Sequence, residues 1–338
     1  HMDQLVRGYE FYVDSFWSGE SCDHHLVGGD LNRRLIPWID QHAKEPFFLW
    51  LHYWDPHTPY NQPPAYRALW QHEPGDPSDL PRKRAALGYE YVPGWGVVGE
   101  LWEPAEGADD RSIDLYDGEI RYTDDLIAEV LAALERNGLA DDTVVMVTSD
   151  HGEQLGQHGI YGHGMLHEAV VQVPLIIWGP GFVPQGKQIQ GYAQHADIAP
   201  TILDLLGADQ EHLPRFDGQS LLPIMAGEGV LTETIMVEGG PLRTLIDGHW
   251  KYTRAYLGGV EELHNLADDP MEVVDLARAE PARLANMRAQ LDERVRAGLG
   301  NGPDPLYEQV ARLAQAWDQR LATPLRTLAW QYPALRRE

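Results

Sequence analysis

The sequence is poor in cysteine, in basic residues and in long apolar runs, and each shortage excludes a class of protein. Cys22 is the only cysteine among 338 residues, which excludes an intrachain disulfide framework and any multi-cysteine zinc or iron–sulfur site. Lysine and arginine number 26 against 52 acidic residues, so the net charge is −26. Such an acidic chain repels phosphate backbones, which argues against nucleic acid as a partner. No apolar run approaches the roughly 20 residues that a transmembrane segment requires.

The same composition leaves the cellular compartment open. A single cysteine fits a cytoplasmic protein, but exported proteins without disulfides have the same composition. His1-Met2 is typical of a cloning remnant, and no charged-then-apolar export signal follows it. The sequence therefore leaves both a cytoplasmic and an exported location possible.

The chain contains an alternation of short apolar runs and amphipathic segments. Helices are predicted for residues 29–42, 112–137 and 197–206, where apolar residues recur at helical spacing. Buried strands are predicted for the apolar runs 47–53, 143–148 and 173–178. This alternation predicts an α/β fold with a mostly parallel sheet flanked by helices.

The pattern changes after about residue 231. Strand-like pieces at hairpin spacing occupy residues 235–256, and a helical, arginine-rich segment begins near Pro281. We therefore predict an α/β core over residues 3–230 and a small C-terminal α+β subdomain over residues 231–338. Residues 61–109 show no clear period and are predicted to form a functional loop, in which 89–102 is a candidate pocket wall for an aromatic or sugar ring.

Two of the predicted strands end in residues that can carry chemistry. Ligands of open α/β sheets bind at the carboxyl ends of strands. Asp150 and His151 directly follow the 143–148 run and offer a carboxylate and an imidazole to one cation; the alternative is a helix N-cap aspartate beside a polar turn residue. His57 lies between two prolines, where it can act as a general acid or contact an anion. Its alternative is a solvated surface histidine.

The order of several motifs resembles the sulfatase family of the alkaline phosphatase superfamily. The resemblance covers about residues 28–277 and rests on HYWDPHTPY at 52–60, YDGEIRYTDD at 116–125, SDHGEQLGQHGIYGHGMLHEAVVQVPLII at 149–177, HADIAPT at 195–201, DGQSL at 217–221, WKY at 250–252, ELHNL at 262–266 and DDP at 268–270. It implies an alkaline-phosphatase-like fold and hydrolysis of a small-molecule or sugar sulfate ester, with one divalent cation as cofactor. Calcium is the expected ion, and manganese and magnesium are the alternatives.

The resemblance also assigns roles to single residues. Asp150 and His151 would be metal ligands, and His57 would contact the transferred group or protonate the leaving oxygen. His163 stands where most family members carry a lysine on the sulfate, and His151 stands where phosphonate monoester hydrolases carry histidine. Hydrolysis of phosphonate or phosphate mono- or diesters therefore stays open, including a two-metal phosphodiesterase.

The nucleophile of the resembled family has no counterpart in this sequence. It is a formylglycine made from cysteine or serine in Cys/Ser-x-Pro-x-Arg, but Cys22 precedes Asp23-His24-His25 and the run 78–82 carries its proline one place late. An apolar strand ending in Asp-Asp is absent as well. We therefore predict the C-terminal two-thirds or so of a sulfatase-like hydrolase, inactive by itself. The sequence leaves two further readings open: a non-catalytic binding protein that kept the fold, and a homodimer formed through an exposed sheet face.

Overall fold

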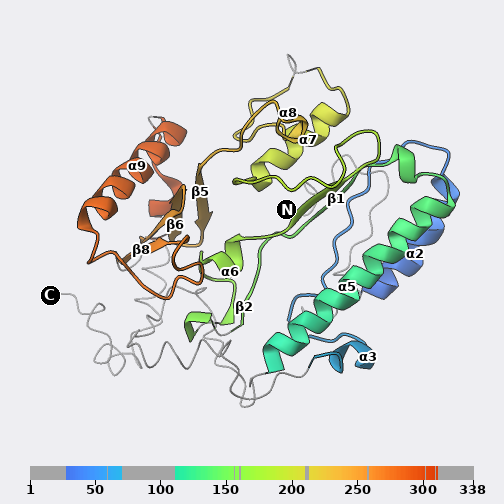
Figure 1. Ribbon diagram of the computed structural model, residues 1–338, viewed down its shortest axis with the longest axis horizontal. Helices are drawn as coiled ribbons and strands as arrows, with labels where there is room; N and C mark the ends of the chain where they lie inside the picture. The colour runs from blue at the N-terminus through green and yellow to red at the C-terminus, as the bar shows by residue number, and fades with distance from the viewer. Residues whose placement is uncertain are drawn as a thin grey trace. The chain divides into compact units, whose positions relative to one another are not determined.

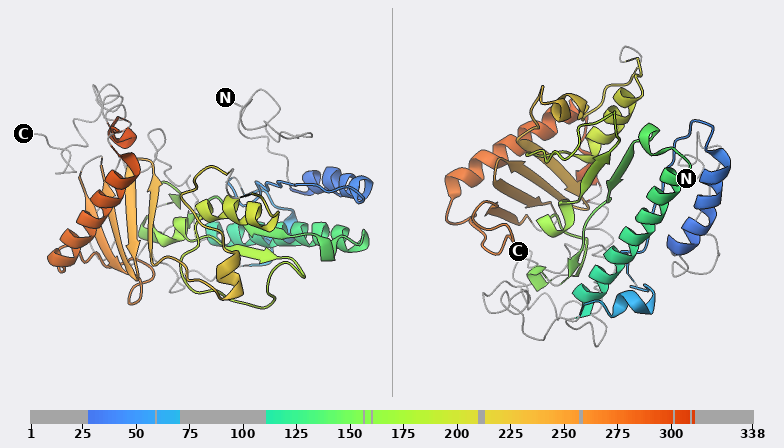
Figure 2. Two further views of the ribbon diagram at one scale, coloured as in Figure 1. Left: turned by 90° about the horizontal axis from the view of Figure 1, so that it is seen from above. Right: turned by 45° about the vertical axis from the view of Figure 1, so that its right-hand side comes forward.

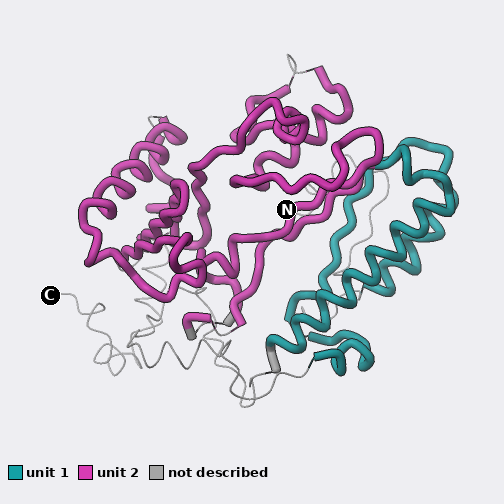
Figure 3. The backbone as a smooth tube through the Cα atoms, in the orientation of Figure 1, with its two compact units in different colours: residues 1–76, 108–143 teal, residues 77–107, 144–338 magenta. Residues whose placement is uncertain are grey.

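The structure, a computed structural model, describes residues 28–58, 60–70, 111–155, 157–159, 161–209, 213–256, 259–300, 302–308 and 310. The chain forms two compact units, residues 1–76 with 108–143 and residues 77–107 with 144–338 (Figure 3). Cys22 and the stretches 78–82 and 89–102 lie outside the described residues. The predicted domain boundary at residue 231 stays a prediction.

The first unit is built on two helices, α2 (Gly28–His42) and α5 (Arg111–Arg136), which lie side by side (Figure 1). Both were predicted from their helical spacing, to within one residue at each end. Asn32 joins them, because its side-chain amide donates to the Leu126 carbonyl and to the Glu129 carboxylate, each at 2.9 Å. The short helices α3 (Pro64–Arg67) and η1 (Ala140–Asp142) complete the unit.

The N-terminus of α2 is fixed by a carboxylate from the loop that contains His57. Both oxygens of Asp55 accept the backbone N–H of Gly28 at 2.9 Å, where the positive end of the helix dipole favours a negative charge. A Cβ atom at Gly28 would lie 2.3 Å from a methyl group of Leu126, so only glycine fits this approach. Burial raises the pKa of Asp55, although the Gly28 hydrogen bond opposes that change.

The predicted buried strand at residues 47–53 is wrong. These residues form no strand, and the side chains of Phe48 and Trp50 are 60% and 65% exposed. A strand requires a neighbour with which to exchange backbone hydrogen bonds, and none of the described strands pairs with this segment. An apolar run alone cannot distinguish a paired strand from an extended connection.

The described residues of the second unit form three sheets. β1 (Val145–Thr148) pairs with β4 (Leu175–Trp178), β2 (Gln154–Leu155) pairs with β3 (Tyr161–Gly162), and the third sheet has the order β5-β6-β7-β8. The mixture of helices and sheets confirms the predicted fold class. The predicted parallel pairing is not seen, since every ladder among the described strands is antiparallel. Apolar patterning reports burial, whereas direction depends on how the intervening segment returns the chain.

The β1–β4 pair has one covered face and one exposed face. Leu175 and Ile177 of β4 pack against a cluster of Val183, Leu221, Ile224, Met225 and Leu231, contributed in part by α8 (Leu222–Ala226). The alternate residues Ile176 and Trp178 are 57% and 37% exposed. The helices η3 (His195–Asp197) and α7 (Ile198–Leu205) follow β4 in the chain, and the helix predicted for residues 197–206 corresponds to α7.

The four-stranded sheet is covered by the long helix α9 (Pro281–Leu299), as Figure 2 shows. Its strands are β5 (Thr234–Gly239), β6 (Leu242–Asp247), β7 (Trp250–Ala255) and β8 (Glu261–Asn265). Met287 and Leu291 of α9 are buried against Leu245, Tyr252 and Leu263 of the sheet. Each such aliphatic side chain contributes about 1.5–3 kcal/mol when it leaves water. Among the described helices, none is both long and apolar enough to cross a membrane.

The exposed face of the β1–β4 pair leads to a prediction about self-association. We expect the chain to form dimers or larger aggregates through Ile176 and Trp178, because exposed apolar sheet faces tend to be covered. Ile176→Lys should shift the population toward monomer in size-exclusion chromatography with light scattering. Val230→Lys, at an exposed apolar residue elsewhere, should leave the distribution unchanged. A monodisperse wild-type monomer at high concentration would contradict the prediction.

A buried carboxylate on α5 leads to a prediction about pH. Burial raises the pKa of Glu119 to about 7, even though Gln62 donates its backbone N–H to Glu119 at 2.8 Å. Between about pH 4.3, its ordinary value, and this raised value, the folded state binds more protons than the unfolded state. The free energy of unfolding therefore falls as pH rises through this interval.

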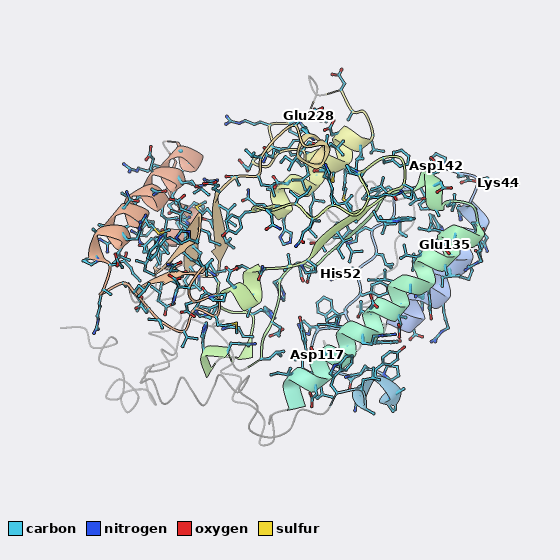
Figure 4. All side chains as sticks on the ribbon, viewed as in Figure 1. Lys44, His52, Asp117, Glu135, Asp142 and Glu228 are labelled. Atoms are coloured by element: carbon cyan, nitrogen blue, oxygen red, sulfur yellow. The ribbon has the colours of Figure 1, made fainter. Side chains whose placement is uncertain are left out.

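Glu119→Gln keeps an acceptor for Gln62 and removes the charge. Urea unfolding should show the variant to be more stable than wild type at about pH 8 and similar to it at about pH 4–5. Glu135→Gln, at an exposed position on the same helix (Figure 4), is the control and should follow wild type. If the free energy of unfolding of Glu119→Gln depends on pH as that of wild type does, Glu119 is not the origin of this pH dependence.

Candidate functional site

Asp150 and His151 follow the end of β1 directly, as the sequence predicts. The Asp150 carboxylate accepts the backbone N–H of His151 at 2.9 Å and the Ser149 hydroxyl at 3.4 Å. The Nδ1 atom of His151 lies 2.8 Å from the Gly152 carbonyl oxygen, so this nitrogen carries the hydrogen in the neutral ring. The lone pair of Nε2 then faces the Asp150 carboxylate, 3.6 Å away. Two acceptors placed this way attract a proton or a cation between them.

His163 joins this pair through its ring. The imidazoles of His151 and His163 are stacked, with centroids 4.0 Å apart and planes 25° from parallel. The Nδ1 atom of His163 lies 3.3 Å from the Glu153 carboxylate, and this hydrogen bond raises the pKa of His163. The structure therefore brings Asp150, His151 and His163 together. It adds Glu153, which sequence reasoning missed although it stands only two residues after His151.

Close backbone packing holds the residues around Gly152 in place. Gly152 donates its N–H to the Val170 carbonyl at 2.7 Å, and Val170 belongs to helix α6 (Glu168–Val171). A Cβ atom at position 152 would lie 2.2 Å from the Ala169 carbonyl oxygen, so no side chain fits there. On the other side, the His195 imidazole contacts the Ser149 carbonyl at 2.8 Å.

The segment between His151 and His163 is attached to the C-terminal part of the second unit. The Nε2 atom of His158, in the short helix η2 (Gln157–Gly159), lies 2.8 Å from the Met271 carbonyl oxygen. Its ring contacts that of His167, with centroids 3.8 Å apart. This attachment fixes the path of the chain from His151 to His163.

His57 belongs to the first unit, whereas the other three predicted site residues belong to the second. It ends a turn in which its backbone N–H donates to the Trp54 carbonyl at 2.9 Å. The His57 ring lies 4.8 Å from the Trp54 ring, and its Nδ1 contacts the Thr58 carbonyl. The structure therefore gives His57 a defined, half-buried position, and its role stays a prediction.

The metal role predicted for Asp150 and His151 stays a prediction, although both side chains are of kinds that bind divalent cations. Asp150 and His151 are suitable donors for a divalent cation, since carboxylate oxygen suits hard cations and imidazole suits transition metals. Among the described residues, no group of three or more His, Cys, Asp or Glu side chains could hold a metal ion. Two donors fit a weakly bound cation, and its identity stays a prediction.

The chain is similar in sequence to proteins of a known family. A family model described as Sulfatase matches residues 16–208. The chain belongs to the sulfatase family. It is 31% identical over 258 residues to choline-sulfatase of Rhizobium meliloti, a match that covers 70% of this chain and 48% of that protein. It is 32% identical to a multifunctional alkaline phosphatase superfamily protein of Trinickia caryophylli, over 57% of this chain and 40% of that protein.

Solved structures of other proteins are similar to this chain in fold. A phosphonate monoester hydrolase from Silicibacter pomeroyi aligns with a TM-score of 0.64 at 22% identity, covering 88% of this chain and 67% of that one. The phosphonate monoester hydrolase of Agrobacterium radiobacter aligns with a TM-score of 0.62 at 23% identity, covering 79% and 61%. The alkaline-phosphatase-like fold expected from the motifs is confirmed. The chain spans 48% and 40% of the two curated relatives described above.

The acceptor pair at the end of β1 predicts weak cation binding. Asp150→Asn removes the only full negative charge of the pair, so its affinity for Ca²⁺ or Mn²⁺ should fall at least about tenfold. Isothermal titration of the chain with each metal chloride measures this. Asp142→Asn, at an exposed aspartate of η1 (Figure 4), should bind like wild type. Equal affinities in wild type and Asp150→Asn would show that Asp150 is not a ligand.

Proposed function

We propose that this chain contributes the anion- and cation-binding part of a hydrolase of sulfate esters. The observation that supports the proposal most is the stacked His151–His163 pair with a carboxylate beside each ring. One end of this group offers two cation donors, and the other offers a histidine whose neighbour Glu153 favours its protonated form. A sulfate ester has an anionic group that needs both kinds of contact.

Each residue has a role in the proposal. Asp150 and His151 hold one divalent cation, with calcium expected and manganese or magnesium as alternatives. When bound, the cation supplies a positive charge that polarises an oxygen of the transferred group. His163 places a second positive charge on the anion. His57 contacts the transferred group or protonates the leaving oxygen. The substrate is a sulfate ester of a small molecule or sugar.

The nucleophile is the part that the printed chain does not supply. None of its 338 residues forms a Cys/Ser-x-Pro-x-Arg motif, from which a formylglycine would be made. An active site without its nucleophile loses most of its rate enhancement. We therefore expect the printed chain to hydrolyse sulfate esters no faster than buffer.

A second candidate is hydrolysis of phosphonate or phosphate esters. It is supported by His163, which stands where most sulfatases carry a lysine on the sulfate. A lysine is charged at neutral pH, whereas a histidine carries a full charge only when it is protonated. Sulfate is therefore less strongly indicated as the bound group. The relative from Trinickia caryophylli is named as multifunctional, which is compatible with more than one ester class. A non-catalytic binding protein is the third candidate, supported by the lack of a nucleophile motif.

The test compares this chain with whatever product the open reading frame containing its sequence encodes, called the complete product below. Both are assayed with an aryl sulfate, an aryl phosphonate monoester and an aryl phosphate, with and without chelator. Asp150→Asn and His57→Asn in the complete product should each lower kcat by at least about a hundredfold, as loss of a metal ligand or general acid does. Asp142→Asn should leave kcat unchanged.

The outcomes separate the candidates. Sulfate turnover that depends on Asp150 and His57 supports the proposal, and turnover of the phosphonate alone supports the second candidate. Cation binding without turnover of any ester supports a binding protein. Full activity of Asp150→Asn would exclude the metal role given to this residue.

A further inference from the structure

A buried histidine on β8 is placed between two hydrogen-bond acceptors. His264 is 1% exposed, and its Nδ1 lies 3.0 Å from the Val274 carbonyl oxygen. A carbonyl only accepts, so Nδ1 carries a hydrogen. The polar atom facing Nε2 is a carboxylate oxygen of Glu262 at 3.8 Å. In a neutral ring, Nε2 would turn a bare lone pair toward this negative charge, and a buried nitrogen cannot turn to water instead.

A second histidine approaches the same carboxylate oxygen with the opposite tautomer. The Nε2 atom of His167 lies 3.6 Å from Glu262, while its Nδ1 lies 3.2 Å from the side-chain amide nitrogen of Gln154. That amide donates to Nδ1, so the hydrogen of a neutral His167 ring is on Nε2 and points toward Glu262. In this tautomer the Nε2–H of His167 points toward Glu262, whereas a neutral His264 would present a lone pair to the same carboxylate.

The charges around these histidines favour an additional proton on His264. Lys251 stands directly opposite His264 in the β7–β8 ladder, and its ammonium group lies 2.8 Å from Glu168 and 2.9 Å from Glu272. Two carboxylates therefore contact a single lysine, and a third, that of Glu262, lies beside His264. The negative charges of Glu272 and Asp275 also act on His264 and raise its pKa. Because uncompensated buried charge is costly, a positive charge on His264 brings the group closer to neutrality.

These contacts connect the sheet to the segment between the site residues. Gln154 and His158 belong to that segment and His167 follows it closely, while Glu262, His264 and the residues around Val274 belong to the sheet and the loop after it. His158 and Glu272, at two of the junctions, are the two non-glycine residues with positive φ in the described chain, at 64° and 54°. Such conformations persist only when surrounding contacts enforce them.

We propose that His264 is a positioning residue: it is protonated at neutral pH and, through Glu262 and His167, holds residues 154–168 against the four-stranded sheet. The segment held in this way contains His163 and begins three residues after His151. The inference extends the proposed function by adding a pH-dependent support to the site. It does not depend on which ester the site cleaves.

The direction of the pH effect follows from the two titrating groups. Burial favours neutral His264, but the contact with Glu262 outweighs it and raises the pKa of His264. Its stabilisation is therefore complete below about pH 6.5, the ordinary value, and is lost as pH rises through the raised value. Burial opposes the charge of Glu262, but His167 and His264 lower its pKa. Its contribution is therefore retained well into the acidic range.

The first test reads the proton on His264 directly. The full chain is labelled with ¹³C and ¹⁵N, and its histidine ring nitrogens are assigned by through-bond correlation to the backbone. At about pH 7, above the ordinary pKa of about 6.5, both nitrogens of His264 should have the shifts of a protonated ring. A neutral His264 ring at about pH 7 would overturn the proposal. This measurement on wild type decides the point even if a variant fails to fold.

The second test reads the segment by hydrogen exchange with mass spectrometry. After correction for intrinsic exchange rates, protection of peptides covering 154–168 should fall by up to about tenfold per pH unit above about pH 6.5. Glu262→Gln should weaken this pH dependence, and the exposed-site control His249→Asn should retain it. Equal protection at every pH in wild type, or unchanged behaviour in Glu262→Gln, would refute the positioning role. Neither test measures hydrolysis, so its failure is distinct from failure of the proposed function.

Discussion

The second unit depends on the buried ammonium group of Lys251. It lies on a central strand of the four-stranded sheet and contacts Glu168 at the start of α6 and Glu272 in the loop after β8. Removing one partner from such a buried group costs about 3–5 kcal/mol, because the remaining charges lose their compensation. A hydrogen bond from the Glu168 backbone to Glu272, at 2.6 Å, closes the arrangement. Two segments distant in the chain are thereby fixed to one strand.

The geometry of the candidate site depends on these contacts of Lys251, Glu168 and Glu272. Helix α6 begins at Glu168 and receives the backbone of Gly152 through Val170. Because α6 is held in place, the turn that presents His151 is held as well. His163 lies in the chain between this turn and α6. A reactive cluster on a loop can have a defined shape only when such a support exists.

The sequence predicted the parts of this molecule that depend on local pattern. α2 and α5 were found because apolar residues recur at helical spacing, and Asp150 and His151 because they directly follow an apolar run. The run 47–53 was misassigned because its pattern shows apolar character but not whether a partner strand exists. The direction of β4 depends on the path of residues 149–174. The roles of Glu262, His264 and Glu272 depend on contacts such as the Glu168–Glu272 bond, which spans 104 residues and leaves no local signal.

The contact between Gly28 and Asp55 has a consequence for how changes spread through the first unit. The residues are 27 positions apart, and Asp55 shares a turn with His57. Any side chain at position 28 would push against Leu126 and separate the helix end from its carboxylate. The orientation of His57 is therefore coupled to a residue outside the motif that contains it. A substitution at Gly28 would act on that imidazole without altering any group that touches a ligand.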